Sequence, residues 1–120
     1  MGYESKFYVI DKSSFEREDG SKWGEVIAMF NMCKVYELVD KIKNYPPTDA
    51  YIYADEGDTE ITKDRHGDPL TEIPIKDMIK ILEELKSVLG SYRRYEPFLQ
   101  MLKAFNTEEW ENLTILHYGY

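Results

Sequence analysis

The sequence predicts a single α+β domain, in which a small, largely antiparallel sheet of about four strands carries two to three helices on one face. Three observations support this fold class. Segments near both ends of the chain favour β structure, amphipathic helical segments follow residue 35, and the length of 120 residues suits one hydrophobic core. We find no internal repeat and no low-complexity linker, so one domain spanning residues 1–120 is expected.

Two strands are predicted in the first third of the chain. Residues 6–10, "KFYVI", are aromatic and β-branched, and residues 25–33, "EVIAMFNMC", alternate in a way that suits a strand. Between them the dipeptide Asp19-Gly20 lies in a polar run, which predicts a hairpin with a long exposed connection. A helix over residues 25–33 is the alternative that the pattern leaves open.

The period of the apolar residues then changes. Residues 35–44 have helical spacing and end before two prolines, Pro46 and Pro47, which predicts a short helix. Residues 49–54, "DAYIYA", favour a third strand that leads directly into an acidic segment.

A longer helix is predicted over residues 74–89. Pro74 suits a first helical turn, Asp77 suits the positive end of the helix dipole, and Gly90 suits a left-handed stop. One apolar stripe runs along this helix: Ile75, Met78, Ile79, Leu82, Leu85 and Leu89.

A further helix is expected to begin at Pro97, because the residue before a proline avoids the α region. Residues 113–118 have the pattern of a closing strand. The predicted order of elements is therefore β-β-α-β-α-α-β.

The overall charge excludes some functions and favours others. Twenty-three acidic residues against fifteen basic ones give a formal net charge of −8, which repels a nucleic-acid backbone and favours partners with a basic surface. The single cysteine, Cys33, cannot form an internal disulfide, and neither a signal peptide nor an apolar stretch long enough to cross a bilayer is recognised. We therefore expect a cytoplasmic protein that binds neither membranes nor nucleic acid directly.

The acidic segment over residues 53–70, "YADEGDTEITKDRHGDPL", holds six carboxylates and one histidine. A calcium-binding loop needs ligands and a glycine at set positions, and no register of this segment provides them. Asp64, His66 and Asp68 could contribute to a transition-metal site, although a solvated acidic loop explains the same residues.

No catalytic set is apparent from the sequence. Cys33 and the serines at positions 13, 14 and 21 have no histidine nearby in the sequence to act as a base, and the seven glycines are scattered rather than grouped into a phosphate-binding loop. We therefore predict a protein that is not an enzyme, with no cofactor and no metal.

Tyrosines and one basic element remain as candidates for binding. Ten tyrosines are more than a core of this size can bury with a partner for every hydroxyl, so several are expected on a protein-binding surface. In "SYRRY", Arg93 and Arg94 lie between Tyr92 and Tyr95, which suits an interface hot spot; internal pairing with the acidic segments is equally compatible.

Four segments of the chain, "YESKFYVIDKS", "EVIAMFNMCKV", "YRRYEPFLQMLKAF" and "LHYGY", resemble a set of small uncharacterised proteins carried by phages and other mobile elements of Gram-positive bacteria. Small acidic proteins of this kind are similar in character to anti-CRISPR and other anti-defence inhibitors, which often occupy a basic nucleic-acid channel. The resemblance brings no catalytic motif with it and assigns no functional residue.

These observations lead to one hypothesis and two alternatives. The protein is expected to bind and inhibit a host nucleic-acid-handling defence complex, with its acidic residues acting as a DNA mimic in a basic channel. The alternatives are a metal-binding regulator or metal-dependent enzyme that uses residues 55–68, and a phage assembly or accessory protein. The predicted partner-binding residues are Tyr51, Tyr53, Asp55, Glu56, Asp58, Glu60, Asp64, Tyr92, Arg93, Arg94 and Tyr95.

Overall fold

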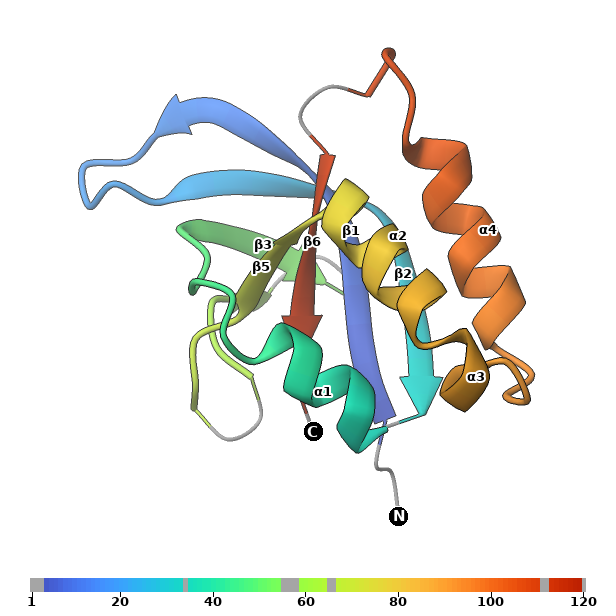
Figure 1. The fold of residues 1–120 in the computed structure, drawn as a ribbon. Coiled ribbons are helices and arrows are strands. Elements are labelled where there is room, and N and C mark those ends of the chain that lie inside the picture. The colour runs from blue at the N-terminus through green and yellow to red at the C-terminus, as the bar shows by residue number, and fades with distance from the viewer. Residues whose placement is uncertain (1–3, 34, 55–58, 65–66, 111–112, 120) are drawn as a thin grey trace.

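The computed structural model describes residues 4–33, 35–54, 59–64, 67–110 and 113–119. Six strands form one sheet in the order β4-β3-β2-β1-β6-β5 (Figure 1). The strands are β1 (Glu4–Glu16), β2 (Lys22–Cys33), β3 (Ala50–Ala54), β4 (Thr59–Ile61), β5 (Thr71–Pro74) and β6 (Leu113–Tyr118). The helices are α1 (Tyr36–Ile42), α2 (Ile75–Glu84), α3 (Lys86–Leu89) and α4 (Tyr95–Phe105).

The α+β class is confirmed, but the predicted sheet was wrong in two respects. It has six strands rather than about four, because β4 and β5 are only three and four residues long and lie in polar, turn-rich sequence. It is also mixed rather than largely antiparallel, since β2 and β3 pair in parallel. The parallel pairing is possible because α1 and its flanking loops carry the chain back to the start of β2 before β3 begins.

The β1–β2 hairpin is much longer than the two predicted strands. Its turn is the predicted one: Gly20 has φ +83°, and the Asp19 carboxylate accepts hydrogen bonds from the backbone N–H and the hydroxyl of Ser21 at 3.0 and 2.6 Å. These hydrogen bonds with Ser21 lower the pKa of Asp19. A register shift between Val9 and Ile10 bends the pair at its middle, as expected of a bulge.

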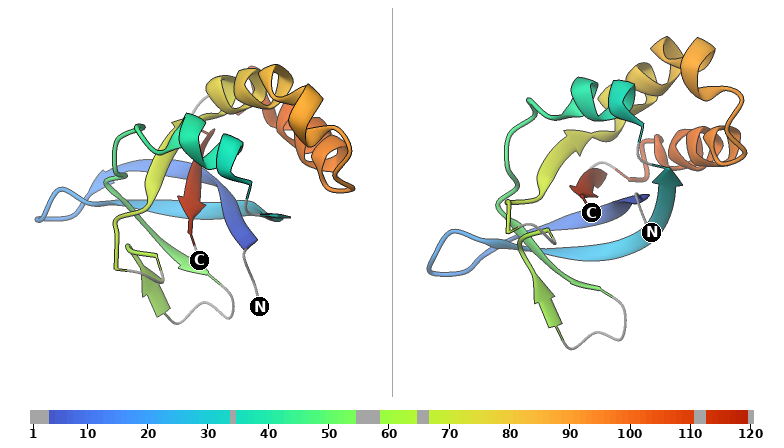
Figure 2. Two further views of the ribbon diagram at one scale, coloured as in Figure 1. Left: turned by 60° about the horizontal axis from the view of Figure 1, so that its bottom comes forward. Right: turned by 90° about the horizontal axis from the view of Figure 1, so that it is seen from below.

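The main core lies between the sheet and the helices, which cover one face (Figure 2). Phe98 of α4 stacks on Phe30 with ring centroids 4.8 Å apart, and its ring lies tilted against that of Phe7 at 5.0 Å. Neither Phe7 nor Phe98 is exposed to solvent. Aromatic contacts therefore fix α4 on the β1–β2 pair.

A second core cluster lies on the other face of the sheet and consists of Tyr8, Ile10, Ala50, Ile52, Leu70 and Leu116. The sheet curves around this cluster, so that the segment before β3 lies next to β5 although several strands separate β3 from β5 in the sheet order. Two backbone hydrogen bonds join them: Thr48 N–H donates to the Leu70 carbonyl at 2.8 Å, and Glu72 N–H donates to the Pro46 carbonyl at 3.0 Å. Figure 2 shows β3 and β4 turned away from the helices beneath the sheet.

Three details of the helices differ from the sequence-based prediction. The helix expected over residues 74–89 is divided at Leu85 into α2 and α3, and Gly90 has a right-handed conformation (φ −61°) rather than a left-handed one. The last helix begins at Tyr95, two residues before Pro97. A proline in the first helical turn is tolerated because the N–H that it lacks would have no partner within the helix.

Candidate functional site

One part of the sheet carries three aromatic side chains from β2 and β3 beside a carboxylate from β4. Trp23 of β2 is the parallel partner of Tyr51 of β3, and Tyr53 is the antiparallel partner of Glu60 of β4. Paired residues share a face, and alternate residues of a strand face opposite sides. Because Gly24 lies against Ile10 and Ile52 of the second core cluster, Trp23 points to the opposite, outer side. We call Arg17, Trp23, Tyr51, Tyr53 and Glu60 the outer patch.

Arg17, from the end of the hairpin, holds the outer patch together. Its Nη2 atom donates to Glu60 Oε1 at 2.6 Å and to the Tyr53 hydroxyl at 3.3 Å, and its Cζ atom lies 3.5 Å from the centre of the Tyr51 ring. The hydrogen bond with Glu60 raises the pKa of the Arg17 guanidinium further above its usual range. Tyr51 meets Tyr53 edge to face, with ring centroids 5.9 Å apart.

Exposure divides the aromatic residues of the outer patch into two groups. Tyr51 is buried, whereas Trp23 and Tyr53 are 42% and 40% exposed. An exposed aromatic ring offers a large contact area and loses little conformational entropy on binding, so Trp23 and Tyr53 are the candidate contact residues of this face.

The structure describes only some of the acidic residues that were predicted to bind a partner. Glu60 is paired with Arg17, while Asp55, Glu56 and Asp58 lie outside the described residues. Asp64 closes a turn: its carboxylate accepts the backbone N–H of Asp68 at 3.1 Å, and Gly67 in this turn has φ +83°.

His66, which the metal hypothesis requires, also lies outside the described residues. Within residues 4–33, 35–54, 59–64, 67–110 and 113–119, no three histidine, cysteine, aspartate or glutamate residues gather in a way that could hold a metal ion.

The "SYRRY" segment leads from α3 into α4, and only its last residue is buried. Tyr92, Arg93 and Arg94 are exposed, and the Arg94 Nη1 atom donates to the backbone carbonyl of Asn31 in β2 at 3.2 Å. The prediction that Tyr95 contacts a partner is wrong: its side chain is 1% exposed, and its hydroxyl donates to the Leu82 carbonyl at 2.8 Å. Burial raises the pKa of Tyr95. Its hydroxyl satisfies a carbonyl near the end of α2, so Tyr95 belongs to the core.

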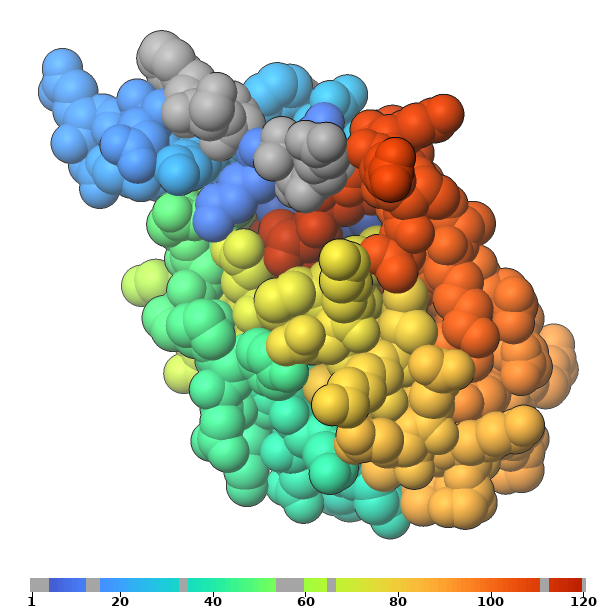
Figure 3. All heavy atoms as spheres, turned by 45° about the horizontal axis from the view of Figure 1, so that its top comes forward, coloured from blue at the N-terminus to red at the C-terminus, as the bar shows by residue number. Residues whose placement is uncertain are grey.

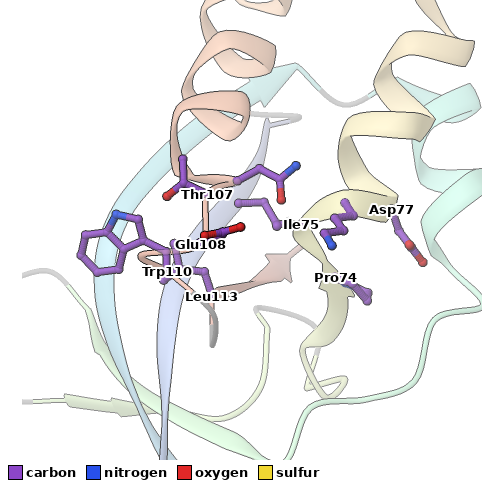
Figure 4. A pocket seen from close by; sticks show the side chains of 9 residues that line it. Pro74, Ile75, Asp77, Thr107, Glu108, Trp110 and Leu113 are labelled. Carbon is purple, nitrogen blue, oxygen red and sulfur yellow. The ribbon is translucent and has the colours of Figure 1, made fainter.

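A cleft of about 730 Å³ lies between the start of α2 and the segment that follows α4 (Figure 4). Figure 3 shows this region from outside, as a depression with β6 at its bottom. Trp110 and Glu108 lie on one side of the cleft and Asp77 on the other, where the Asp77 carboxylate accepts a hydrogen bond from the Tyr45 hydroxyl at 2.9 Å. The described lining contains no histidine or cysteine.

A polar network closes one end of the second core cluster. The Lys12 ammonium group pairs with Asp49 and with Glu72, the latter at 3.1 Å, and the Thr48 hydroxyl donates to Glu72 at 2.6 Å. Burial works to lower the pKa of Lys12, but the hydrogen bonds with both carboxylates raise it. The hydrogen bond from Lys12 lowers the pKa of Asp49. The network joins β1, β5 and the start of β3, and we assign it to stability.

Replacing Lys12 by methionine is expected to lower the free energy of unfolding at pH 7 by about 1 kcal/mol, the usual scale for a partly exposed ion pair. Because the folded pKa of Asp49 lies below its ordinary value of 3.8, its contribution is present above that pH and is lost as the pH falls through the lowered pKa. Lys12→Met should therefore flatten the loss of stability in acid, measured by urea unfolding between pH 7 and pH 2.

The matched control is Lys43→Met, which removes an exposed ion pair with Asp40 at 3.3 Å. The acid dependence of this variant should equal that of the wild type. An unchanged acid dependence in Lys12→Met would show that the Lys12 network does not contribute to acid stability.

Comparison of the chain with protein-family models, with curated proteins and with solved structures found no match in any of the three. Among the described residues, no helix has the length and apolar character needed to cross a membrane.

Two residues of the outer patch, Arg17 and Trp23, were not among the binding residues predicted from the sequence. Trp23 follows the polar hairpin connection, and Arg17 lies within it, so neither belongs to a recognisable motif. The one local signal was Trp23 beside Gly24, since a glycine in a strand often marks a close approach of another element. Both residues join the outer patch only through the tertiary pairing of β2, β3 and β4.

Proposed function

We propose that this protein is a non-enzymatic inhibitor that binds a basic surface of a host nucleic-acid-handling defence complex. The observation that carries the proposal is the position of the outer patch. Tyr53 and Glu60 are paired across β3 and β4, and the acidic residues Asp55, Glu56 and Asp58 lie in the connection between these two strands. Exposed aromatic contact area and a run of carboxylates thus belong to one continuous stretch of chain.

Charge supports a basic partner. The net charge of −8 steers the protein toward positively charged surfaces, and a run of carboxylates can occupy sites that otherwise bind phosphates. Arg17 orders Tyr51, Tyr53 and Glu60 before any partner binds, so little conformational entropy remains to be lost in the complex.

The chemistry of the described residues favours binding over catalysis. The cleft between α2 and the segment after α4 has no histidine or cysteine in its described lining. The pKa shifts of Lys12, Arg17, Asp19, Tyr45, Asp49 and Tyr95 are caused by burial and by hydrogen bonds with neighbouring groups of the fold. Lys12, Tyr45 and Asp49 line a second cleft of about 430 Å³. Ion pairs and hydrogen bonds with neighbouring carboxylates explain their shifts, which therefore do not by themselves indicate catalysis.

The test is capture from a lysate of a Gram-positive bacterium by the tagged protein, with nuclease treatment and at two salt concentrations. We expect recovery of a basic nucleoprotein complex, reduced at high salt because screening weakens charge pairing and unchanged by nuclease because the contact is with protein. The protein should also displace labelled DNA from the captured complex, as followed by fluorescence anisotropy. Recovery of mobile-element proteins alone would contradict this proposal and favour an assembly role.

A further inference from the structure

Two unneutralised carboxylates lie beside the exposed Trp23. Asp11 of β1 and Glu25 of β2 are direct partners in the antiparallel register, so their side chains share one face of the sheet. Trp23 lies two residues before Glu25 and therefore points to the same side. Glu25 is exposed, Asp11 is half-buried and Trp23 is 42% exposed. We call these three residues the Trp23 site.

The Trp23 site places like charges opposite each other, which disfavours the sheet. Within the described part of the chain, neither Asp11 nor Glu25 forms an ion pair. The nearest lysines in the sequence are engaged elsewhere: Lys12 with Asp49 and Glu72, and Lys22 with Glu16 at 3.7 Å. The free protein therefore keeps two negative charges next to an exposed indole ring.

The same face already holds a guanidinium group in similar surroundings. Arg17 lies over the Tyr51 ring at 3.5 Å and is bonded to the Glu60 carboxylate at 2.6 Å. Trp23 is the neighbour of Tyr51 in the sheet register. The Tyr51 ring and the Glu60 carboxylate thus bind Arg17 of the same chain. The Trp23 site has an indole ring, which binds cations better than a phenol ring does, and two carboxylates, Asp11 and Glu25.

We propose that the Trp23 site binds an arginine side chain of the partner protein. The guanidinium plane would stack on the indole of Trp23, and its N–H groups would donate to Asp11 and Glu25. A lysine fits less well, because an ammonium group neither stacks nor forms two parallel hydrogen bonds with a carboxylate. Nucleic acid is excluded at this point by the two carboxylates. The inference rests on the proposed function, since it names the chemistry by which the partner is held.

The direct test uses a triarginine peptide and a variant in which Trp23 is the only tryptophan, Trp110→Phe. We expect the peptide to change the fluorescence of Trp23, trilysine to need a concentration at least several-fold higher, and tricitrulline to have no effect. Asp11→Asn with Glu25→Gln in the same background should weaken the response to triarginine by about tenfold. An equal response to triarginine and tricitrulline, or no loss in the double variant, would overturn the inference.

The thermal stability of the Asp11→Asn, Glu25→Gln double variant is the control for its folding. Removing two like charges that face each other should leave its thermal stability equal to or above that of the wild type. A lower midpoint of unfolding would contradict the assignment of Asp11 and Glu25 to a binding site, because it would mean that these carboxylates stabilise the fold.

Capture of the partner distinguishes this inference from the proposed function. Trp23→Ala should reduce recovery of the complex by at least about tenfold, as for an aromatic hot spot, whereas Tyr36→Ala, which removes a 77% exposed aromatic side chain of α1, should leave it unchanged. If Trp23→Ala captures the complex as well as the wild type does, the inference fails and the proposed function stands. If the wild type captures no such complex but Trp23 still responds to triarginine, the proposed function fails and the arginine site stands.

Discussion

Replacing Phe98 by alanine is expected to lower the free energy of unfolding by about 3–5 kcal/mol, the largest effect of any single change considered. Phe98 has no exposed surface, and its ring contacts Phe7 and Phe30 at 5.0 and 4.8 Å. Its removal would leave a cavity between α4 and the β1–β2 pair, at the point where the helix is fixed to the sheet. Urea unfolding followed by circular dichroism measures the loss.

The matched control is Phe105→Ala, the same chemical change at a half-buried position on the same helix. Phe105 meets Trp110 edge to face at 6.0 Å and lies at the margin of the main core, so we expect a loss of about 1–2 kcal/mol. Equal losses in both variants would mean that α4 is not anchored mainly through Phe98.

Neutralising Asp55, Glu56, Asp58 and Glu60 together, by Asn and Gln, is expected to weaken binding of the captured complex by about a hundredfold or more. Each carboxylate that meets a basic group of the partner contributes through steering and charge pairing, and four such groups act on one stretch of chain. The dissociation constant is measured by surface plasmon resonance at two salt concentrations. The salt dependence should also become smaller, because fewer charge pairs remain to be screened.

The control carries the same change in charge elsewhere on the molecule. Glu37, Glu96, Glu108 and Glu109 are exposed on α1, α4 and the segment after α4, and their replacement by Gln should change binding by no more than a few-fold. Loss of the Arg17–Glu60 ion pair in the first variant costs little stability because the pair is exposed. Tight binding by the first variant, or equal loss in both, would contradict a role for the acidic segment.

The predicted binding residues and the outer patch overlap only in part. Tyr53 and Glu60 were both named as binding candidates and are paired across β3 and β4, whereas Tyr51, named with them, is buried beneath Arg17. Tyr95 is in the core because its helix begins two residues earlier than Pro97 indicated. The "SYRRY" segment was open to either an exposed position or internal pairing with the acidic segments. Arg93 and Arg94 are both exposed, and Arg94 also donates to the backbone carbonyl of Asn31 in β2, a partner that neither alternative named.

The sequence by itself determined the features that depend on neighbours along the chain. The apolar stripe from Ile75 to Leu89, the Asp19-Gly20 turn and the closing strand at Leu113–Tyr118 follow from local periodicity and turn chemistry, and all are present in the fold. The high acidic charge and the lack of a catalytic motif are likewise properties of the residues alone.

Only the tertiary structure decided which distant residues meet. Trp23 and Tyr51 are 28 positions apart, and Arg17 and Glu60 are 43 positions apart. Local periodicity specifies which face of a strand is apolar but not which strand lies beside it, and nothing local distinguishes a parallel from an antiparallel neighbour for β3. The outer patch and the Trp23 site arise from that pairing, because packing around the second core cluster selects the register that sets these side chains side by side.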